Sequence, residues 1–143
     1  MKNFNASSTE AASKEARIER FNTNCLNAVS EFKNLQKLIN TFLEIEYSQA
    51  NIDLMKVRLV EFDNQTGRFL ASAKEVFAVI EEIRKVGEYT EDIKQTCALV
   101  SLLNLQILAI LAFADEFIKQ SNKKSLTGIK RIAKTMNDIS DAA

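Results

Sequence analysis

Few side chains in this sequence could perform covalent or acid–base chemistry. Cys25 and Cys97 are the only cysteines, and the 143 residues contain no histidine. Without histidine there is no imidazole base to activate a serine or a cysteine, and neither histidine-ligated zinc nor histidine-ligated haem can form. The spacing of the two thiols does not fit a Cys-x-x-Cys motif either. We therefore expect both cysteines to behave as small buried hydrophobes and not as nucleophiles.

Paired carboxylates are the remaining candidates for acid–base catalysis. Such catalysis needs two carboxyl groups that converge on one pocket and have different pKa values. Adjacent residues on a helix point about 100° apart, so neighbouring carboxylates diverge. We therefore expect no catalytic, metal-binding or cofactor-binding site, and we expect that the protein is not an enzyme. The pairs are Glu44 with Glu46, Glu81 with Glu82, and Asp115 with Glu116.

Composition and hydrophobic periodicity together predict an all-α fold. The chain is 46% hydrophobic and 27% charged, with three glycines and no proline. This composition is too apolar for disorder and too poor in turn formers for a many-stranded sandwich or barrel. The predicted fold is an antiparallel bundle of four to five helices. It has a flexible tail at 1–9, a single domain at 10–143 and a central apolar helix at about 91–120.

The first predicted helix, at about 9–46, carries a regular apolar seam. Its apolar residues alternate in steps of three and four, which is the spacing of a coiled-coil contact. This seam would pack equally well on a neighbouring helix of the same chain or on a partner protein. We take it as a candidate interface and expect it to be buried in one of these two ways. The candidate interface residues are Ile18, Phe21, Phe32, Leu35, Ile39 and Phe42.

Turn signals divide the rest of the chain. The first expected break lies at 48–51, although one long bent helix also fits because no proline or glycine enforces the break. Asparagine and glycine tolerate positive φ, so the segment 63–67 is predicted to be a turn. Gly87 is expected to cap the end of the next helix, and Thr90 to cap the start of the apolar helix. A last break at 122–125 precedes a short fifth helix.

Residues 95–114 contain no charged side chain, so the helix that they form is apolar on every side. Such a helix is covered either by neighbouring helices or by lipid. About 20 residues suffice to span a bilayer, but Asn104 and Gln106 need hydrogen-bond partners, which a facing helix supplies and lipid does not. We expect a buried central helix, so that Leu105→Asp or Leu108→Asp would unfold the bundle.

The charge of the chain favours no class of partner overall. Lys and Arg number 19, as do Asp and Glu, so no net charge draws the chain to nucleic acid or to an anionic membrane. The run 119–134 is locally basic and could bind phosphates, lipid headgroups or an acidic protein surface, although a solvated helix face is the simpler interpretation. Acidic residues at 81–92 could neutralise it within the fold or across an oligomer. The candidate anionic-partner patch is Lys119, Lys123, Lys124, Lys130, Arg131 and Lys134.

These patterns predict a function in non-enzymatic association through helix faces, as an adaptor, an inhibitor or an assembly component. We expect the partner to be a protein or a second copy of the chain, and not a nucleic acid, and we expect no cofactor. The alternative is a membrane-active or pore-forming bundle that exposes 95–114 to lipid. Two isolated cysteines, and an N-terminus without an apolar signal segment, lead us to expect a cytoplasmic location.

Overall fold

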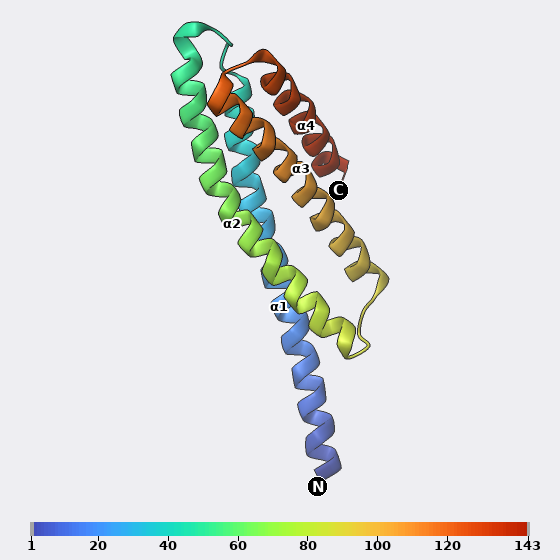
Figure 1. The fold of residues 1–143 in the computed structure, drawn as a ribbon. Coiled ribbons are helices and arrows are strands. Elements are labelled where there is room, and N and C mark those ends of the chain that lie inside the picture. The colour runs from blue at the N-terminus through green and yellow to red at the C-terminus, as the bar shows by residue number, and fades with distance from the viewer. Residues whose placement is uncertain (1, 143) are drawn as a thin grey trace.

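The computed structural model of the chain is an all-α bundle of four helices (Figure 1). It describes the backbone of residues 2–142 and the side chains of residues 13–142, and residues 2–142 form no strand. The predicted fold class is confirmed. The elements are α1 at Lys2–Leu43, the short 3-10 helix η1 at Gln49–Asn51, α2 at Ile52–Lys85, α3 at Glu91–Gln120 and α4 at Lys123–Ala142.

Two helical hairpins make up the bundle (Figure 1). Helix α1 packs antiparallel on α2, α3 packs antiparallel on α4, and α2 contacts α3 between the two hairpins. Helix α4 has 20 residues where α3 has 30, so it ends partway along α3. At its N-terminal end α1 extends beyond the other helices.

The break between α1 and α2 lies where the sequence predicts it. Helix α1 ends at Leu43, and the chain reverses through η1 before α2 begins. Tyr47 holds the reversal against the second hairpin, because its hydroxyl donates a hydrogen bond to the carbonyl of Ser121 at 2.7 Å. Helices α1 and α2 are therefore separate and antiparallel. Helix α1 begins at Lys2 and not near residue 9, while the flexibility expected of residues 1–9 stays a prediction.

Helix α2 carries one uninterrupted seam. Apart from Val79, its buried side chains follow one another in steps of three and four, which keeps one helix face against its neighbours. The ring of Phe69 packs against Phe32 of α1 with 5.9 Å between ring centres. The buried residues of α2 are Ile52, Met55, Leu59, Phe62, Thr66, Phe69, Ala73, Val76, Val79, Ile80 and Ile83.

The predicted turn at 63–67 is wrong, because this segment is helical within α2. Phe62 and Phe69 lie seven residues apart, so both face the core if the helix continues between them. Thr66 fills the seam position between them, and its hydroxyl donates a hydrogen bond to the carbonyl of Phe62 at 2.9 Å. Gly67 points into open space. Burying two phenylalanines outweighs the helix penalty of one glycine, about 1 kcal/mol.

The caps between α2 and α3 agree with the sequence prediction. Gly87 follows α2 with a φ of 74°, a conformation that glycine adopts without strain. The N–H groups of Gly87 and Glu88 donate to carbonyls of the last turn at 3.1 and 3.0 Å, which is the bond pair of a Schellman motif. Thr90 precedes α3, and its side-chain oxygen accepts the N–H of Ile93 at 3.3 Å.

Helix α3 does not occupy the centre of the bundle, so this part of the prediction is wrong. It packs on α2 and α4, and only 28% of its most apolar stretch is buried. Leu105 is 62% exposed and Leu108 is 49% exposed, so an aspartate at either position would reach water and not the core. Two of the helices expected to cover α3 are one continuous helix, α2, and α1 packs chiefly on α2.

Candidate functional site

An exposed apolar face runs along the outside of α3. Leu102, Leu105 and Leu108 are 39%, 62% and 49% exposed, although Leu103 and Ile107 on the same helix are buried. At about 100° per residue, the three exposed leucines point within about 60° of the direction of Leu105. Small residues continue this face toward both ends of the helix. We call this face the outer stripe: Ala98, Ser101, Leu102, Leu105, Leu108, Ala109 and Ala112.

Charged side chains close the outer stripe at both ends. Glu91 and Lys94 precede it on the same side of the helix, and Glu116 and Lys119 follow it. Within residues 13–142, none of these four side chains forms an ion pair. The outer stripe is therefore an apolar patch bounded by charges that remain available to a partner.

The opposite face of α3 joins the core. Its buried residues alternate in steps of three and four and pack toward α2 and α4. Asn104 lies at the edge of this face, and its Oδ1 atom is buried without a hydrogen-bond partner among the described residues. The hydrogen bond that we expected from a facing helix to this oxygen is not formed. A buried acceptor without a partner lowers the free energy of unfolding by about 1–3 kcal/mol. The buried residues are Val100, Leu103, Ile107, Ile110, Ala114 and Phe117.

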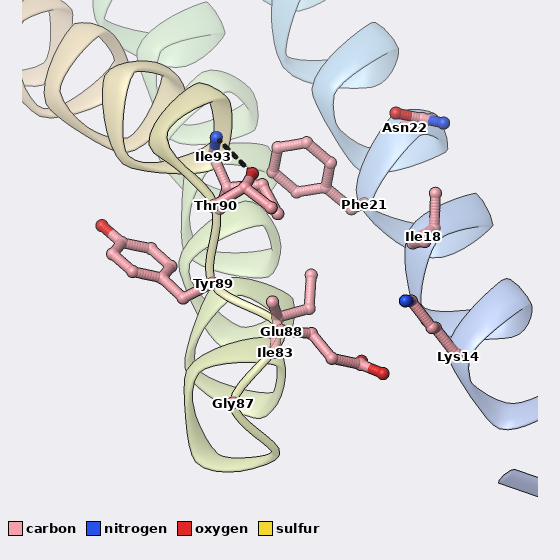
Figure 2. Close-up of a pocket in the computed structure, with 10 residues that line it drawn as sticks. All are labelled: Lys14, Ile18, Phe21, Asn22, Ile83, Gly87, Glu88, Tyr89, Thr90 and Ile93. Atoms are coloured by element: carbon pink, nitrogen blue, oxygen red, sulfur yellow. Dashed lines mark hydrogen bonds between the residues drawn. The ribbon is translucent and has the colours of Figure 1, made fainter.

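A cleft of about 570 Å³ lies between α1 and the loop that joins α2 to α3 (Figure 2). Phe21, Ile83 and Ile93 give it an apolar lining, while Lys14 and Glu88 add charge. Figure 2 shows Glu88 extending from the loop into the space that faces α1. The carboxylate of Glu88 is already paired with Arg17 at 2.9 Å.

Two ion pairs beside this cleft join α1 to the last turns of α2 and to the loop that follows α2. Arg17 contacts Glu88 at 2.9 Å, with both side chains mostly buried, and Arg20 contacts Glu82 at 2.8 Å at the surface. The hydrogen bond from Arg20 holds the pKa of Glu82 below its usual value. Three of the acidic residues at 81–92 thus pair with arginines near them, and not with the basic run at 119–134.

The seam of α1, predicted as a candidate interface, is mostly used inside the chain. Ile18 is 43% exposed and Phe21 is partly buried, and both line the cleft. The other four residues are at most 5% exposed, so a partner cannot reach them while the bundle is folded. These four are Phe32, Leu35, Ile39 and Phe42.

The six residues of the anionic-partner patch are all exposed, on the last turn of α3 and along α4. Lys134 pairs with Asp138 at 3.8 Å, and the ammonium of Lys123 lies 6.0 Å from the centre of the Tyr47 ring. The other four form no ion pair within residues 13–142. Binding of an anionic partner by this patch stays a prediction.

Both cysteines are free thiols and partly buried. Cys25 lines a small apolar groove of about 100 Å³ between α1 and α3, together with Phe32 and Leu99. Burial raises the pKa of the Cys25 thiol, which lowers the thiolate fraction and hence the reactivity at neutral pH. This placement agrees with the interpretation of Cys25 as a small hydrophobic residue.

No group of three or more cysteine, aspartate or glutamate side chains within the described part of the chain is placed to hold a metal ion. Comparison with known proteins gives no matching family model, no similar curated protein and no similar solved structure. The function of this chain is therefore inferred from its own geometry.

Sequence reasoning identified the uncharged run at 95–114 but missed that its outward side forms a separate surface. Two signals pointed to it. The buried series around Ile107 is mostly large and branched, whereas the series around Leu105 has leucine in the middle and alanine or serine toward both ends. Four of the charges beyond the ends of the run, Glu91, Lys94, Glu116 and Lys119, also share the direction of Leu105, which indicates a face that meets water.

Proposed function

We propose that this protein acts by non-enzymatic association with another helix through the outer stripe of α3. The observation that carries the proposal is the exposure of Leu102, Leu105 and Leu108 on a face without charge between 95 and 114. Contiguous exposed apolar surface marks binding sites, because covering it contributes roughly 25 cal/mol per Å². The spacing of the stripe suits a partner that is itself helical.

The remainder of the chain acts as the scaffold for this face. The buried series of α3 anchors it on α2 and α4, and the ion pairs of Arg17 and Arg20 hold α1 to the loop after α2 and to α2 itself. A rigid helix loses little conformational entropy when it binds, which favours affinity. An adaptor, an inhibitor or an assembly component works through a surface of this kind and needs no catalytic group.

The test compares the protein partners of three tagged chains in an extract of the source cells. Leu105→Asp places a charge at the centre of the outer stripe. Val57→Asp is the matched control, because it places the same charge at the centre of the other exposed apolar row, Leu54, Val57 and Val60 of α2. We expect the wild type and Val57→Asp to retain the same bound chains, including further copies of the protein, and Leu105→Asp to lose them. Equal binding by all three chains would contradict the proposal.

One observation favours the membrane-active alternative: α3 is long and apolar enough to cross a bilayer. Its inner face is packed against α2 and α4, so insertion would require the bundle to open. Vesicle flotation separates the two functions. We expect no binding to neutral or anionic vesicles, whereas flotation of the wild type that Leu105→Asp abolishes would favour the membrane.

A further inference from the structure

We infer that the helix covering the outer stripe is α3 of a second copy of this chain, packed antiparallel about a two-fold axis at Leu105. This inference rests on the proposed association through the outer stripe and names its partner. The support comes from the symmetry of the stripe, the size of its residues and the charges at its ends.

The residues that face outward with Leu105 are spaced symmetrically about it. They lie 4, 7, 11 and 14 positions away in both directions along α3. At about 100° per residue, all of them point within about 40° of the direction of Leu105. They are Ser101 and Ala109, Ala98 and Ala112, Lys94 and Glu116, and Glu91 and Lys119.

A two-fold axis through Leu105 places each of these residues opposite its counterpart in the second copy. The two Leu105 side chains meet at the axis, and Ala98 faces the partner's Ala112. Leu102 and Leu108, also symmetric about Leu105, flank the contact. Small side chains on both sides of the central leucines let the two helix axes approach closely. A self-complementary face of this kind is what a two-fold dimer requires.

The charges at the two ends are complementary only when the helices run antiparallel. Lys94 then faces the partner's Glu116, and Glu91 faces the partner's Lys119, with each pair repeated by the symmetry. A parallel pair would set Lys94 against the partner's Lys94 and Glu116 against the partner's Glu116. Complementary charges of this kind fix the orientation of a contact more than they set its affinity.

The same axis places opposite ends of the two α3 helices beside each other. It brings the end of α3 in one copy, with Lys119 of the anionic-partner patch, toward the acidic start of α3 in the other. Glu91 and Asp92 at that start form no ion pair within residues 13–142. The contact runs from Glu91 to Lys119, roughly 42 Å at 1.5 Å per residue.

A charge swap tests the orientation by sedimentation velocity over a concentration series. We expect the wild type to convert from monomer to dimer, and Lys94→Glu to weaken dimerisation about tenfold, because it sets like charges together at both ends. Adding Glu116→Lys to Lys94→Glu restores the pairing in an antiparallel dimer. Both changes also suit the helix dipole, so the fold is not put at risk. A double variant as weak as Lys94→Glu alone would overturn the antiparallel arrangement.

Cross-linking with a short bis-maleimide gives a second readout that does not depend on charge. Leu105→Cys lies at the axis and should cross-link to itself. Ala98→Cys and Ala112→Cys should cross-link to each other when mixed, and little when each is alone. The wild-type chain controls for Cys25 and Cys97. Stronger cross-linking of Ala98→Cys alone than of the mixture would contradict the antiparallel arrangement about Leu105.

The failure of this inference is distinguishable from failure of the proposed function. A wild type that stays monomeric at every concentration overturns the second copy as the partner. If Leu105→Asp then still loses another bound protein that Val57→Asp retains, association through the outer stripe stands. If no bound protein responds to Leu105→Asp, both the inference and the proposed function fail.

Discussion

Two apolar faces of this protein share the same three- and four-residue spacing, but one is buried and the other is exposed. The seam of α1 is buried against its own chain from Phe32 to Phe42, whereas the outer stripe of α3 is exposed around Leu105. The buried seam is built from large aromatic and branched residues, and the exposed stripe from alanine, serine and leucine. Spacing alone therefore does not show whether a face is buried within its own chain. The size of the side chains and the charges at the ends separate these two faces.

The largest difference in stability between a buried and an exposed apolar face is expected for two substitutions within α3. Ile107 is fully buried, so Ile107→Asp places an unpaired charge in the core and should cost more than about 4 kcal/mol, enough to unfold the chain. Leu105→Asp, two positions away, should leave the helical signal in circular dichroism intact. If both variants unfold, the outer stripe belongs to the folding core.

Truncation gives the next largest effect. Phe42 is 1% exposed, so Phe42→Ala should lower the free energy of unfolding by about 3–5 kcal/mol, the usual range for a buried phenylalanine. Leu105→Ala should change it by no more than about 0.5 kcal/mol, since its side chain already meets water. Urea unfolding at a concentration that keeps the chains monomeric measures both. Similar losses in the two variants would remove the distinction between the faces.

Alanine substitutions at two helical glycines, one packed and one exposed, are expected to change the stability less. A Cβ at Gly128 of α4 would lie 2.6 Å from the ring of Phe113, whereas one at Gly67 of α2 would meet nothing within 4 Å. We expect Gly128→Ala to destabilise the bundle by about 1–3 kcal/mol through overpacking. Gly67→Ala should stabilise it by about 0.5–1 kcal/mol through helix propensity. If both variants shift the melting temperature in the same direction, the close contact between Gly128 of α4 and Phe113 of α3 is not present.

The smallest effect is expected at the surface pair that joins α1 to α2. Arg20 lowers the pKa of Glu82, so the ionised carboxylate stabilises the folded state at pH values above the usual glutamate pKa, about 4.3. This contribution is lost as the pH falls through the lower pKa of the folded state. Glu82→Gln should therefore be less stable than the wild type at pH 7 and equally stable in acid. A stability difference that persists unchanged in acid would argue against the pair.

The sequence predicts the ends of helices better than it predicts what covers them. Gly87 and Thr90 act locally, through a positive φ and a side-chain oxygen, so the pattern alone identified both caps. The segment 63–67 has turn-forming residues, but it lies between Phe62 and Phe69, and long-range burial decided its conformation. The position of α3 depends on how many helices surround it, which no local pattern contains. The exposure of the outer stripe depends on that number, although the small residues of this face and the charges beyond its ends pointed to a separate surface.

Sedimentation velocity of Leu105→Asp, with circular dichroism on the same samples, most directly tests whether the outer stripe serves association and not folding. We predict that the wild type associates as its concentration rises. Leu105→Asp should stay monomeric over the same range with an unchanged helical spectrum, because the aspartate at this position reaches water in the monomer and is buried only in the contact. Association that Leu105→Asp leaves unaltered, or a Leu105→Asp chain that is unfolded, would contradict this assignment.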